Sequence, residues 1–282
     1  MRPQWLKTQL SPGFNGEKTG RLLKRLGLNT VCSEALCPNR DHCYRRNTAA
    51  FLILGRVCTR DCGYCAVEHG KPLPPDPAEA ARVSRAARAM GLRYAVITSV
   101  TRDDLPDGGA GFFRDVVKSV RKRVPGIKVE VLTPDFRGAE SSLETVAEAH
   151  PDVFNHNLET VERLFPSLRG SGGYSTSLRV LSEYGRITGD TPTKSGLMLG
   201  LGETDSDVEK ALSDLRGAGV TILTLGQYLP PSLKHARVIR YISPDEFGEW
   251  RNRALAMGFE AVASGPLVRS SYHADFYASP LL

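Results

Sequence analysis

Apolar residues recur along this chain in short runs, separated by turn residues and by longer segments with a different spacing. Six of the short runs are rich in β-branched residues and bounded by turn residues, a pattern that predicts β-strands. They occupy residues 49–54, 93–98, 127–132, 152–155, 196–199 and 220–225. We expect these strands to form the buried sheet of an α/β protein.

The longer segments carry apolar residues three and four positions apart, which predicts amphipathic helices. One helix is expected to start at Asp76-Pro77, a second to cover 208–215, and a third to open at the capping box 243–246. Alternating strands and helices imply parallel strands with right-handed crossovers, in a barrel or in an open sheet. Six repeats rather than eight favour an incomplete (β/α)6 TIM-type barrel.

The expected barrel spans residues 49–258 and has an extension on each side. Residues 1–48 look loop-rich, with one short helix near Gly20 to Leu26, and residues 259–282 form a tail after the last helix. The chain has no internal repeat and no low-complexity segment. We therefore expect one integrated structural unit rather than separate domains.

The composition, with 41% hydrophobic and 24% charged residues among 282, is that of an ordinary globular protein. No apolar run approaches the roughly 20 residues that span a bilayer, and the start of the chain lacks the apolar core of an export signal, so we expect a cytoplasmic protein without membrane contact. The net charge of +6 is modest, and aromatic residues do not interleave with the basic ones, which argues against nucleic acid. Residues 2–46 hold nine Lys and Arg against three acids, which indicates either a solvated face or a docking site for an acidic partner.

All six cysteines lie between positions 32 and 65. Such clustering indicates a shared chemical role, since cysteines that merely pack in a core would be scattered. Disulfide frameworks belong to small secreted domains, and zinc sites usually show paired Cys-x2-Cys knuckles or added histidines. The observed spacings do not fit zinc, and His42 is expected on the surface. Iron–sulfur ligation remains, because thiolates suit iron.

The segment 58–65, CTRDCGYC, follows the first predicted strand and places three cysteines with the spacing Cys-x3-Cys-x2-Cys. Three thiolates leave one iron of a [4Fe-4S] cluster open to a small molecule. This motif closely resembles that of the radical S-adenosylmethionine superfamily. In that superfamily the amino and carboxylate groups of S-adenosylmethionine occupy the open iron.

A second triplet, with the spacing Cys-x4-Cys-x5-Cys over residues 32–43, narrows the resemblance. Together with further motifs it makes the chain resemble the lipoyl synthase family, with matches from about residue 28 to 275. The further motifs are VTRDDLPDGG at 100–109, LTPDF at 132–136, NHNLETV at 155–161, KSGLMLGLGE at 194–203 and RSSY at 269–272.

The resemblance implies a radical sulfurtransferase that inserts sulfur at C6 and C8 of a protein-bound octanoyl-lysine. It implies two [4Fe-4S] clusters, of which the auxiliary one donates the sulfur, and two molecules of S-adenosylmethionine per lipoyl group. The implied partners are an octanoylated lipoyl carrier protein or lipoyl domain, a flavodoxin-type or ferredoxin-type reductant, and an iron–sulfur cluster carrier. The enzyme is expected to be a monomer.

Residue by residue, the resemblance assigns Cys58, Cys62 and Cys65 to the radical-generating cluster. It assigns the auxiliary cluster to Cys32, Cys37, Cys43 and Ser271, with Ser270 as the alternative fourth ligand. Candidate contacts of S-adenosylmethionine are Tyr64, Ser99, Thr101, Arg102, Asn157, Glu159 and Lys194. Tyr64 could equally pack in the core, and Lys194 could be a surface lysine that snorkels.

Two other functions stay open at this point. A two-cluster electron carrier would need little scaffold, so the large α/β body argues against it. Another radical enzyme could use its auxiliary cluster only to transfer electrons, and the RSSY motif at residues 269–272 argues against that alternative.

Overall fold

The computed structural model describes residues 3–6 and 15–281. The chain divides into two compact units. The N-terminal unit holds residues 15–60 together with Ala66–Asp152. The C-terminal unit holds residues 3–6, Asp61–Cys65 and 153–281.

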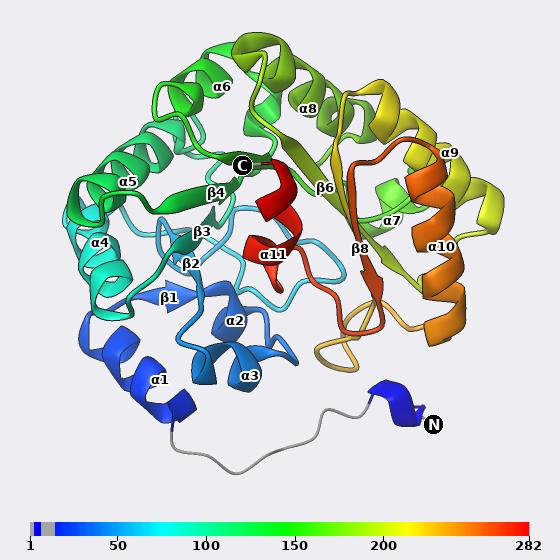
Figure 1. Ribbon diagram of the computed structural model, residues 1–282, viewed down its shortest axis with the longest axis horizontal. Helices are drawn as coiled ribbons and strands as arrows, with labels where there is room; N and C mark the ends of the chain where they lie inside the picture. The colour runs from blue at the N-terminus through cyan, green and yellow to red at the C-terminus, as the bar shows by residue number, and fades with distance from the viewer. Residues whose placement is uncertain (1–2, 7–14, 282) are drawn as a thin grey trace. The chain divides into compact units, whose positions relative to one another are not determined.

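Within its described residues, the N-terminal unit contains four strands. Two-residue β1 pairs antiparallel with β2, whereas β2 with β3 and β3 with β4 pair in parallel. Its elements are α1 (Asn15–Arg25), β1 (Asn29–Thr30), α2 (Val31–Glu34), α3 (Arg40–Arg45), β2 (Ala50–Ile53), α4 (Glu79–Ala89), β3 (Tyr94–Ser99), α5 (Ala110–Arg123), β4 (Lys128–Leu132), the 3₁₀ segment η2 (Phe136–Gly138) and α6 (Glu140–Ala147). Figure 1 shows α4, α5 and α6 on one side of β2–β4.

The described part of the C-terminal unit contains four further strands, and β5 with β6, β6 with β7 and β7 with β8 all pair in parallel. Its elements are η1 (Gln4–Leu6), β5 (Val153–Asn155), η3 (Glu162–Leu164), α7 (Phe165–Leu168), α8 (Tyr174–Thr188), β6 (Thr193–Leu199), α9 (Asp205–Gly217), β7 (Ile222–Gln227), α10 (Pro244–Ala256), β8 (Ala261–Gly265), α11 (Ala274–Ala278) and η4 (Ser279–Leu281). Parallel strands joined by helices give the α/β fold that the sequence predicts.

The core of each unit lies where the apolar stripes of the helices meet the strands. All four residues of β2 are buried, as are Phe113 and Val117 of α5 in the same unit. In the other unit, α9 buries Val208 and Leu212, and Thr204 closes a capping box that starts this helix. Burial of each such side chain contributes about 1.5–3 kcal/mol. No helix of the described residues is long and apolar enough to cross a membrane.

The six predicted strands correspond to β2–β7, and the capping box of residues 243–246 starts α10 as expected. Strand β8 was not predicted, because it lies in the segment expected to be a tail after the last helix. Its sequence, AVASG, is made largely of small residues. Helix α4 begins at Glu79 rather than at Pro77, because Asp76 accepts a hydrogen bond from the Ala78 N–H at 2.8 Å in the turn before it.

Candidate functional site

The first cysteine of the CTRDCGYC segment is fixed through its backbone in the N-terminal unit. The Cys58 N–H donates to the Glu68 carbonyl at 2.7 Å, and the Cys58 carbonyl accepts from the Gly70 N–H at 2.9 Å. The chain thus leaves β2, passes through the cysteines and returns beside Cys58. The Arg60 N–H lies 3.4 Å from the Cys58 sulfur and donates to it. The Cys58 sulfur therefore lies on a loop whose two ends are joined by these backbone hydrogen bonds.

Arg60 anchors this loop to the ends of two strands of the same unit. Its guanidinium donates to both carboxylate oxygens of Asp103 at 2.7 and 2.9 Å, and to both of Asp135 at 2.7 Å. The side chain is 6% exposed, against 2% for Asp135 and 19% for Asp103. Burial lowers the pKa of Arg60, but the hydrogen bonds to the two carboxylates outweigh it and the pKa is raised. Bidentate geometry of this kind fixes orientation as well as charge.

The loop is also held by its neighbour in the sequence. The Thr59 N–H and hydroxyl both donate to the Thr101 carbonyl at 3.0 Å, and the Thr59 hydroxyl accepts from the Asp103 N–H at 3.0 Å. Thr101 therefore supports the cysteine loop through its backbone. Its role as a contact of S-adenosylmethionine stays a prediction.

The second and third cysteines of the segment, Cys62 and Cys65, belong to the C-terminal unit. The Gly63 N–H donates to the Leu168 carbonyl at 2.8 Å, and the Cys62 thiol lies 3.9 Å from the Arg169 carbonyl. From the loop after β7, His235 Nε2 is 3.0 Å from the Cys65 carbonyl. Two separate segments of this unit thus hold residues 62–65.

Tyr64 packs in the core of the C-terminal unit. It lies against a buried apolar cluster made of Leu168, Leu201 and Tyr228. Burial raises the pKa of the Tyr64 phenol well above its usual value, and the charge of Glu159 raises it further. These contacts favour the packing alternative, since the phenol ring fills apolar space beside Cys62 and Cys65.

Asn157 connects the region after β5 with the RSSY motif. Its Nδ2 donates to Glu159 Oε1 at 3.1 Å and to the Ser270 hydroxyl at 3.2 Å. Its Oδ1 is buried and has no hydrogen-bond partner among the described residues. Burial raises the pKa of the Glu159 carboxyl, and Arg169 opposes this shift. A free buried acceptor beside a carboxylate suits a ligand that brings hydroxyl or ammonium donors.

Two further candidates lie at the end of β3 in the N-terminal unit. The Ser99 hydroxyl is buried and, in the part of the chain that the structure describes, has no hydrogen-bond partner. Arg102 is also buried, but its guanidinium is engaged, since it donates to Asp104 twice at 2.8 Å and to the Leu54 carbonyl at 3.2 Å. Ser99 is therefore available to a ligand, whereas Arg102 ties the ends of two strands together.

Lys194 is not a surface residue. It lies on β6, opposite Asn155 of β5 and Ile222 of β7, and its exposed fraction is 1%. The alternative of a snorkelling lysine is therefore wrong. An ammonium group so deeply buried needs anionic or polar partners, which suits its candidate role as a contact of S-adenosylmethionine, whose methionine part carries a carboxylate.

The upstream cysteines come together within the N-terminal unit. Cys32 lies on α2, Cys43 on α3, and Cys37 in the loop between these helices. Burial raises the pKa of the Cys32 thiol to about 11 and of the Cys43 thiol to about 12, and charge interactions among the three thiols add to both shifts. All six cysteines are free thiols, which excludes the disulfide alternative. Three soft donors on neighbouring short helices and the loop between them suit an iron–sulfur cluster, which binds them as thiolates.

The described residues include no group of three or more His, Cys, Asp or Glu side chains already arranged as metal ligands. The argument that the upstream cysteines could hold an iron–sulfur cluster therefore depends on the chemistry of their thiols and on the segment that carries them. Tyr44 is the centre of that segment. Its hydroxyl lies 2.7 Å from the Thr30 hydroxyl and 3.1 Å from that of Ser33, and its carbonyl accepts from the Thr19 hydroxyl at 2.8 Å. Thr30 also caps α2, so the same residues position Cys32.

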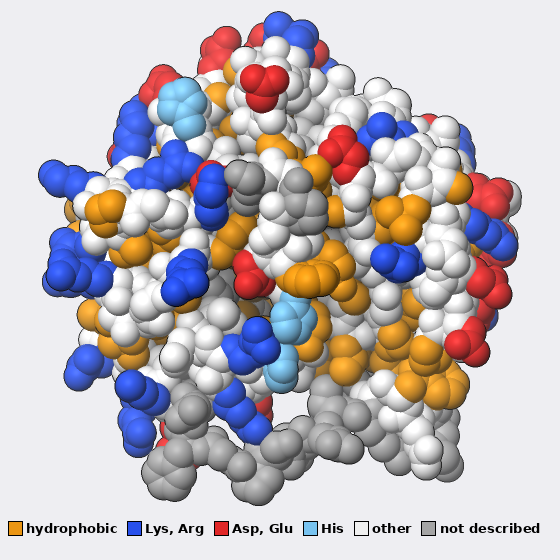
Figure 2. Space-filling view, viewed as in Figure 1, with side chains coloured by type: hydrophobic (Ala, Val, Ile, Leu, Met, Phe, Trp, Pro, Cys, Tyr) orange, Lys and Arg blue, Asp and Glu red, His pale blue; other side chains and the backbone are white. Residues whose placement is uncertain are grey.

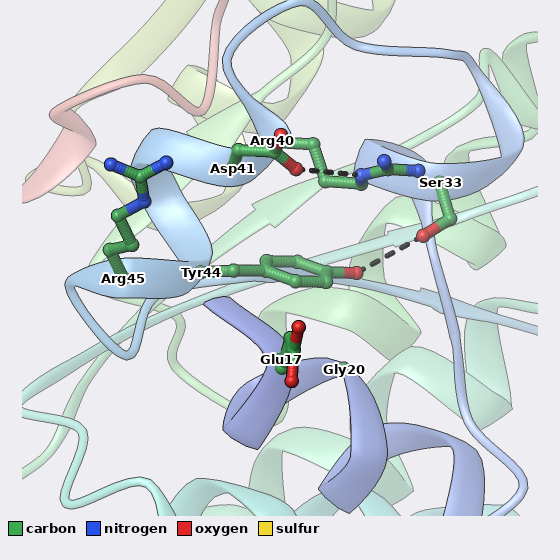
Figure 3. Close-up of a pocket in the computed structure, with 7 residues that line it drawn as sticks. All are labelled: Glu17, Gly20, Ser33, Arg40, Asp41, Tyr44 and Arg45. Atoms are coloured by element: carbon green, nitrogen blue, oxygen red, sulfur yellow. Dashed lines mark hydrogen bonds and ion pairs between the residues drawn. The ribbon is translucent and has the colours of Figure 1, made fainter. Parts of the chain in front are cut away.

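A cavity of about 440 Å³ opens beside Tyr44. Figure 3 shows the Tyr44 ring between α3 and α1, with its hydroxyl turned toward Ser33 and with Glu17 below the ring. Arg40 and Arg45 line the same cavity. Most basic side chains of this extension are exposed, and Figure 2 shows Lys and Arg gathered over α1, α4 and α5.

The RSSY motif follows β8 in the C-terminal unit. Its approach to β7 depends on Gly226, where an added Cβ would lie 2.2 Å from the Val268 carbonyl oxygen. Ser270 is held by Asn157, so Ser271, in the turn before α11, is the serine that we keep as the candidate ligand.

Several residues of the site were missed by the sequence analysis, notably Arg60, Arg169 and His235. Arg60 stands between cysteines and has no pattern of its own, although Asp103 and Asp135 both belong to motifs quoted above. Arg169 donates to the Asn157 carbonyl at 2.7 Å. No local signal in the sequence marks Arg169 or His235.

Comparison with protein families matches residues 52–215 to the radical SAM superfamily. Curated relatives match almost the whole chain. Lipoyl synthase of Histophilus somni (strain 2336) is 53% identical over 282 residues, covering 99% of this chain and 88% of the relative. Lipoyl synthase of Haemophilus influenzae is 52% identical with the same coverage, and that of Pasteurella multocida is 52% identical over 281 residues, covering 98% and 87%.

Solved structures share the fold at much lower identity. Methylornithine synthase superposes with a TM-score of 0.60 at 13% identity, covering 88% of this chain and 78% of that one. Streptococcus suis SuiB bound to S-adenosylmethionine gives 0.60 at 14% identity, covering 88% and 59%. These likenesses confirm the predicted fold class, a partial TIM-type α/β barrel. Strand β8, which pairs in parallel with β7, adds one strand to the six that were predicted.

Proposed function

The chain belongs to the lipoyl synthase family of the radical SAM superfamily, and from this premise we propose how its residues carry out the family's reaction. The reaction is the insertion of two sulfur atoms, at C6 and C8, into an octanoyl chain attached to a lysine of a carrier protein. The superfamily implies S-adenosylmethionine and a [4Fe-4S] cluster. We assign that cluster to Cys58, Cys62 and Cys65.

The second cysteine triplet is the observation that carries the sulfur-inserting function. Three cysteines lie outside the radical motif, on α2, on α3 and in the loop between them, in an extension that Thr30 and Tyr44 hold beside β2. We assign a second [4Fe-4S] cluster to Cys32, Cys37 and Cys43, with Ser271 as its fourth ligand. An alkoxide is a harder ligand than thiolate and should release iron more easily when sulfide is withdrawn.

When bound, the two clusters and S-adenosylmethionine supply one-electron cleavage to a carbon-centred radical and a source of sulfide. The chain's own residues position and shield these groups. Arg60 holds the loop of Cys58, and Tyr64 with Leu168 and Tyr228 closes apolar space beside Cys62. Asn157 offers a free carbonyl oxygen to the cofactor.

The remaining polar candidates would bind S-adenosylmethionine through groups at the ends of strands. Ser99 offers a buried hydroxyl, and the Lys194 ammonium can meet the methionine carboxylate. Glu159 accepts from Asn157 and so fixes which amide atom faces the ligand. Two molecules of S-adenosylmethionine would be consumed for each lipoyl group.

Three kinds of partner follow from this reaction. An octanoylated lipoyl carrier protein or lipoyl domain is the substrate, a flavodoxin-type or ferredoxin-type protein is the reductant, and a cluster carrier restores the consumed sulfide.

The function is tested by anaerobic reconstitution followed by incubation with S-adenosylmethionine, dithionite and an octanoyl-lysine peptide. Mass spectrometry should find two added sulfur atoms and release of 5'-deoxyadenosine. Cys37→Ala should still release 5'-deoxyadenosine but add no sulfur, whereas Cys62→Ala should do neither. Cofactor cleavage without sulfur in the wild-type product would instead indicate a radical enzyme whose second cluster only transfers electrons, and absence of cleavage would indicate an electron carrier.

A further inference from the structure

The loop between β7 and α10 has a surface that the proposed reaction does not use. Residues 229–241, LPPSLKHARVIRY, carry three cations and no acid, so this stretch alone has a charge of +3 out of +6 for the whole chain. Leu233 is fully exposed and Ile239 is 68% exposed. Large apolar side chains among unbalanced charges are typical of a surface that contacts another protein.

The loop is nevertheless firmly attached to its own unit. The Ile239 N–H donates to the Gly200 carbonyl at 2.8 Å, and the Tyr228 hydroxyl donates to the Ala236 carbonyl at 2.9 Å. His235 is held on its other side by the Ser232 hydroxyl, 2.9 Å from Nδ1. The exposure of Leu233 is therefore a property of an anchored loop, and a partner would meet a largely preformed surface.

The same loop is bonded to the radical cysteine segment. The Ala236 N–H donates to the Gly63 carbonyl at 2.8 Å, and His235 contacts the Cys65 carbonyl. Leu233 is two residues from His235, so their Cα atoms are at most about 7 Å apart. A protein seated on Leu233 would thus lie against the segment that carries Cys62 and Cys65.

We propose that residues 229–241 form the docking surface for the electron donor, a small acidic flavoprotein of the flavodoxin type. This inference rests on the proposed function, because only a reductively started reaction needs such a donor. The reduced flavin would lose one electron, the cluster of Cys58, Cys62 and Cys65 would gain it, and no atom would be transferred. Lys234 and Arg237 form no ion pair within the described residues, so both are available to carboxylates of the donor.

An electron donor fits this surface better than the octanoylated substrate does. The substrate must reach the groups of both cysteine triplets, whereas a donor needs to approach only one. The contacts of the loop to Gly63 and Cys65 lead to the radical segment alone. The opposite charges of the loop and of an acidic donor would also speed the association of the two proteins and make its rate sensitive to salt.

The test compares two variants, each with two charge reversals. Both variants have the same net charge, because each pair of changes lowers it from +6 to +2. Lys234→Glu/Arg237→Glu alters the loop, and Arg179→Glu/Arg251→Glu alters exposed residues of α8 and α10 in the same unit. The first readout is the Kd of oxidised flavodoxin for the reconstituted enzyme, measured by calorimetry at low and at physiological salt. The second is sulfur insertion driven by dithionite.

We expect the loop variant to raise the Kd at low salt at least about 10-fold relative to the control variant, with a weaker salt dependence. Dithionite-driven insertion should stay within about twofold of wild type. Leu233→Ser should weaken flavodoxin binding more than Leu73→Ser, a change at another exposed leucine.

Equal Kd values for the two double variants would overturn the proposal. So would a higher KM for the octanoylated carrier under dithionite in the loop variant, which would make the surface a substrate site. Failure of wild-type enzyme to insert sulfur with dithionite would instead refute the proposed function, and flavodoxin binding is measured separately from it.

Discussion

Arg60→Met is the change that most directly tests how the first half of the radical segment is held. Arg60 binds two carboxylates through four N–H···O contacts, and it and Asp135 are almost completely buried. Methionine keeps much of the side-chain volume but removes the cation. The carboxylates of Asp103 and Asp135 would then remain in a poorly hydrated site without their main partner.

Removing one partner of a buried ion pair costs about 3–5 kcal/mol, because the remaining charge stays desolvated. Asp103 keeps a contact with the exposed Arg137 at 3.2 Å, which limits the loss, and we expect the free energy of unfolding to fall by about 4 kcal/mol. Arg60→Lys should recover less than half of this, because one ammonium cannot bridge both carboxylates in bidentate fashion. Bound iron per chain should fall in parallel, since the Cys58 loop loses its anchor.

Arg114→Met is the matched control in the same unit. Arg114 also contacts two acids, Asp115 at 3.0 Å and Glu148 at 3.4 Å, but its side chain is 33% exposed. Its loss should cost at most about 1 kcal/mol. Denaturant unfolding under anaerobic conditions gives both values, with the slope m as a check on cooperativity. A loss at Arg60 no larger than that at Arg114 would refute the reasoning.

Three further changes give separate tests. Ser271→Cys should keep the second cluster, measured by iron content, but lower the sulfur inserted per chain, and Ser270→Ala should leave both unchanged; equal sulfur yields would exclude a special role for Ser271. Gly226→Ala would place a methyl group 2.2 Å from the Val268 carbonyl oxygen, so we expect a loss of about 1–3 kcal/mol in unfolding free energy and poorer retention of the second cluster, and unaltered stability would contradict this contact. Burial raises the pKa of Glu79, so the folded state holds this proton more tightly than the unfolded state, and the stability that Glu79 contributes is lost as the pH rises from 4.5 through its raised pKa. Glu79→Gln should therefore lose less stability than wild type over this pH range, and Tm curves of the two proteins that stay parallel from acidic to alkaline pH would disprove it.

The elements that could be predicted from the sequence are those in which burial requires large apolar or β-branched residues. Strands β2–β7 are buried, and several carry β-branched runs such as Val96 and Ile97. Strand β8 is buried over its first three residues too, but Ala261, Ala263 and the residues that follow are too small to give that signal. The strand is recognised only from its pairing with β7, which is a tertiary contact.

The site divides in a similar way. The cysteines were predictable because ligand identity and spacing are local. The anchoring of Arg60 was not, since Asp103 and Asp135 lie 43 and 75 residues away along the chain. The burial of Lys194 also escaped prediction, because a lysine in a strand can point to solvent or to the core, and only the packed structure distinguishes the two.

The hydrogen bonds around Tyr44 have a consequence for the upkeep of the enzyme. On the proposed function the second cluster is used up as a reactant and would have to be replaced after every round. Thr19, Thr30 and Ser33 bind Tyr44 through atoms that are not proposed cluster ligands. If the second cluster is consumed as proposed, we expect these bonds to hold the extension in place while the cluster is replaced. Damage to Tyr44 should leave the first round nearly intact and lengthen the recovery time before the second.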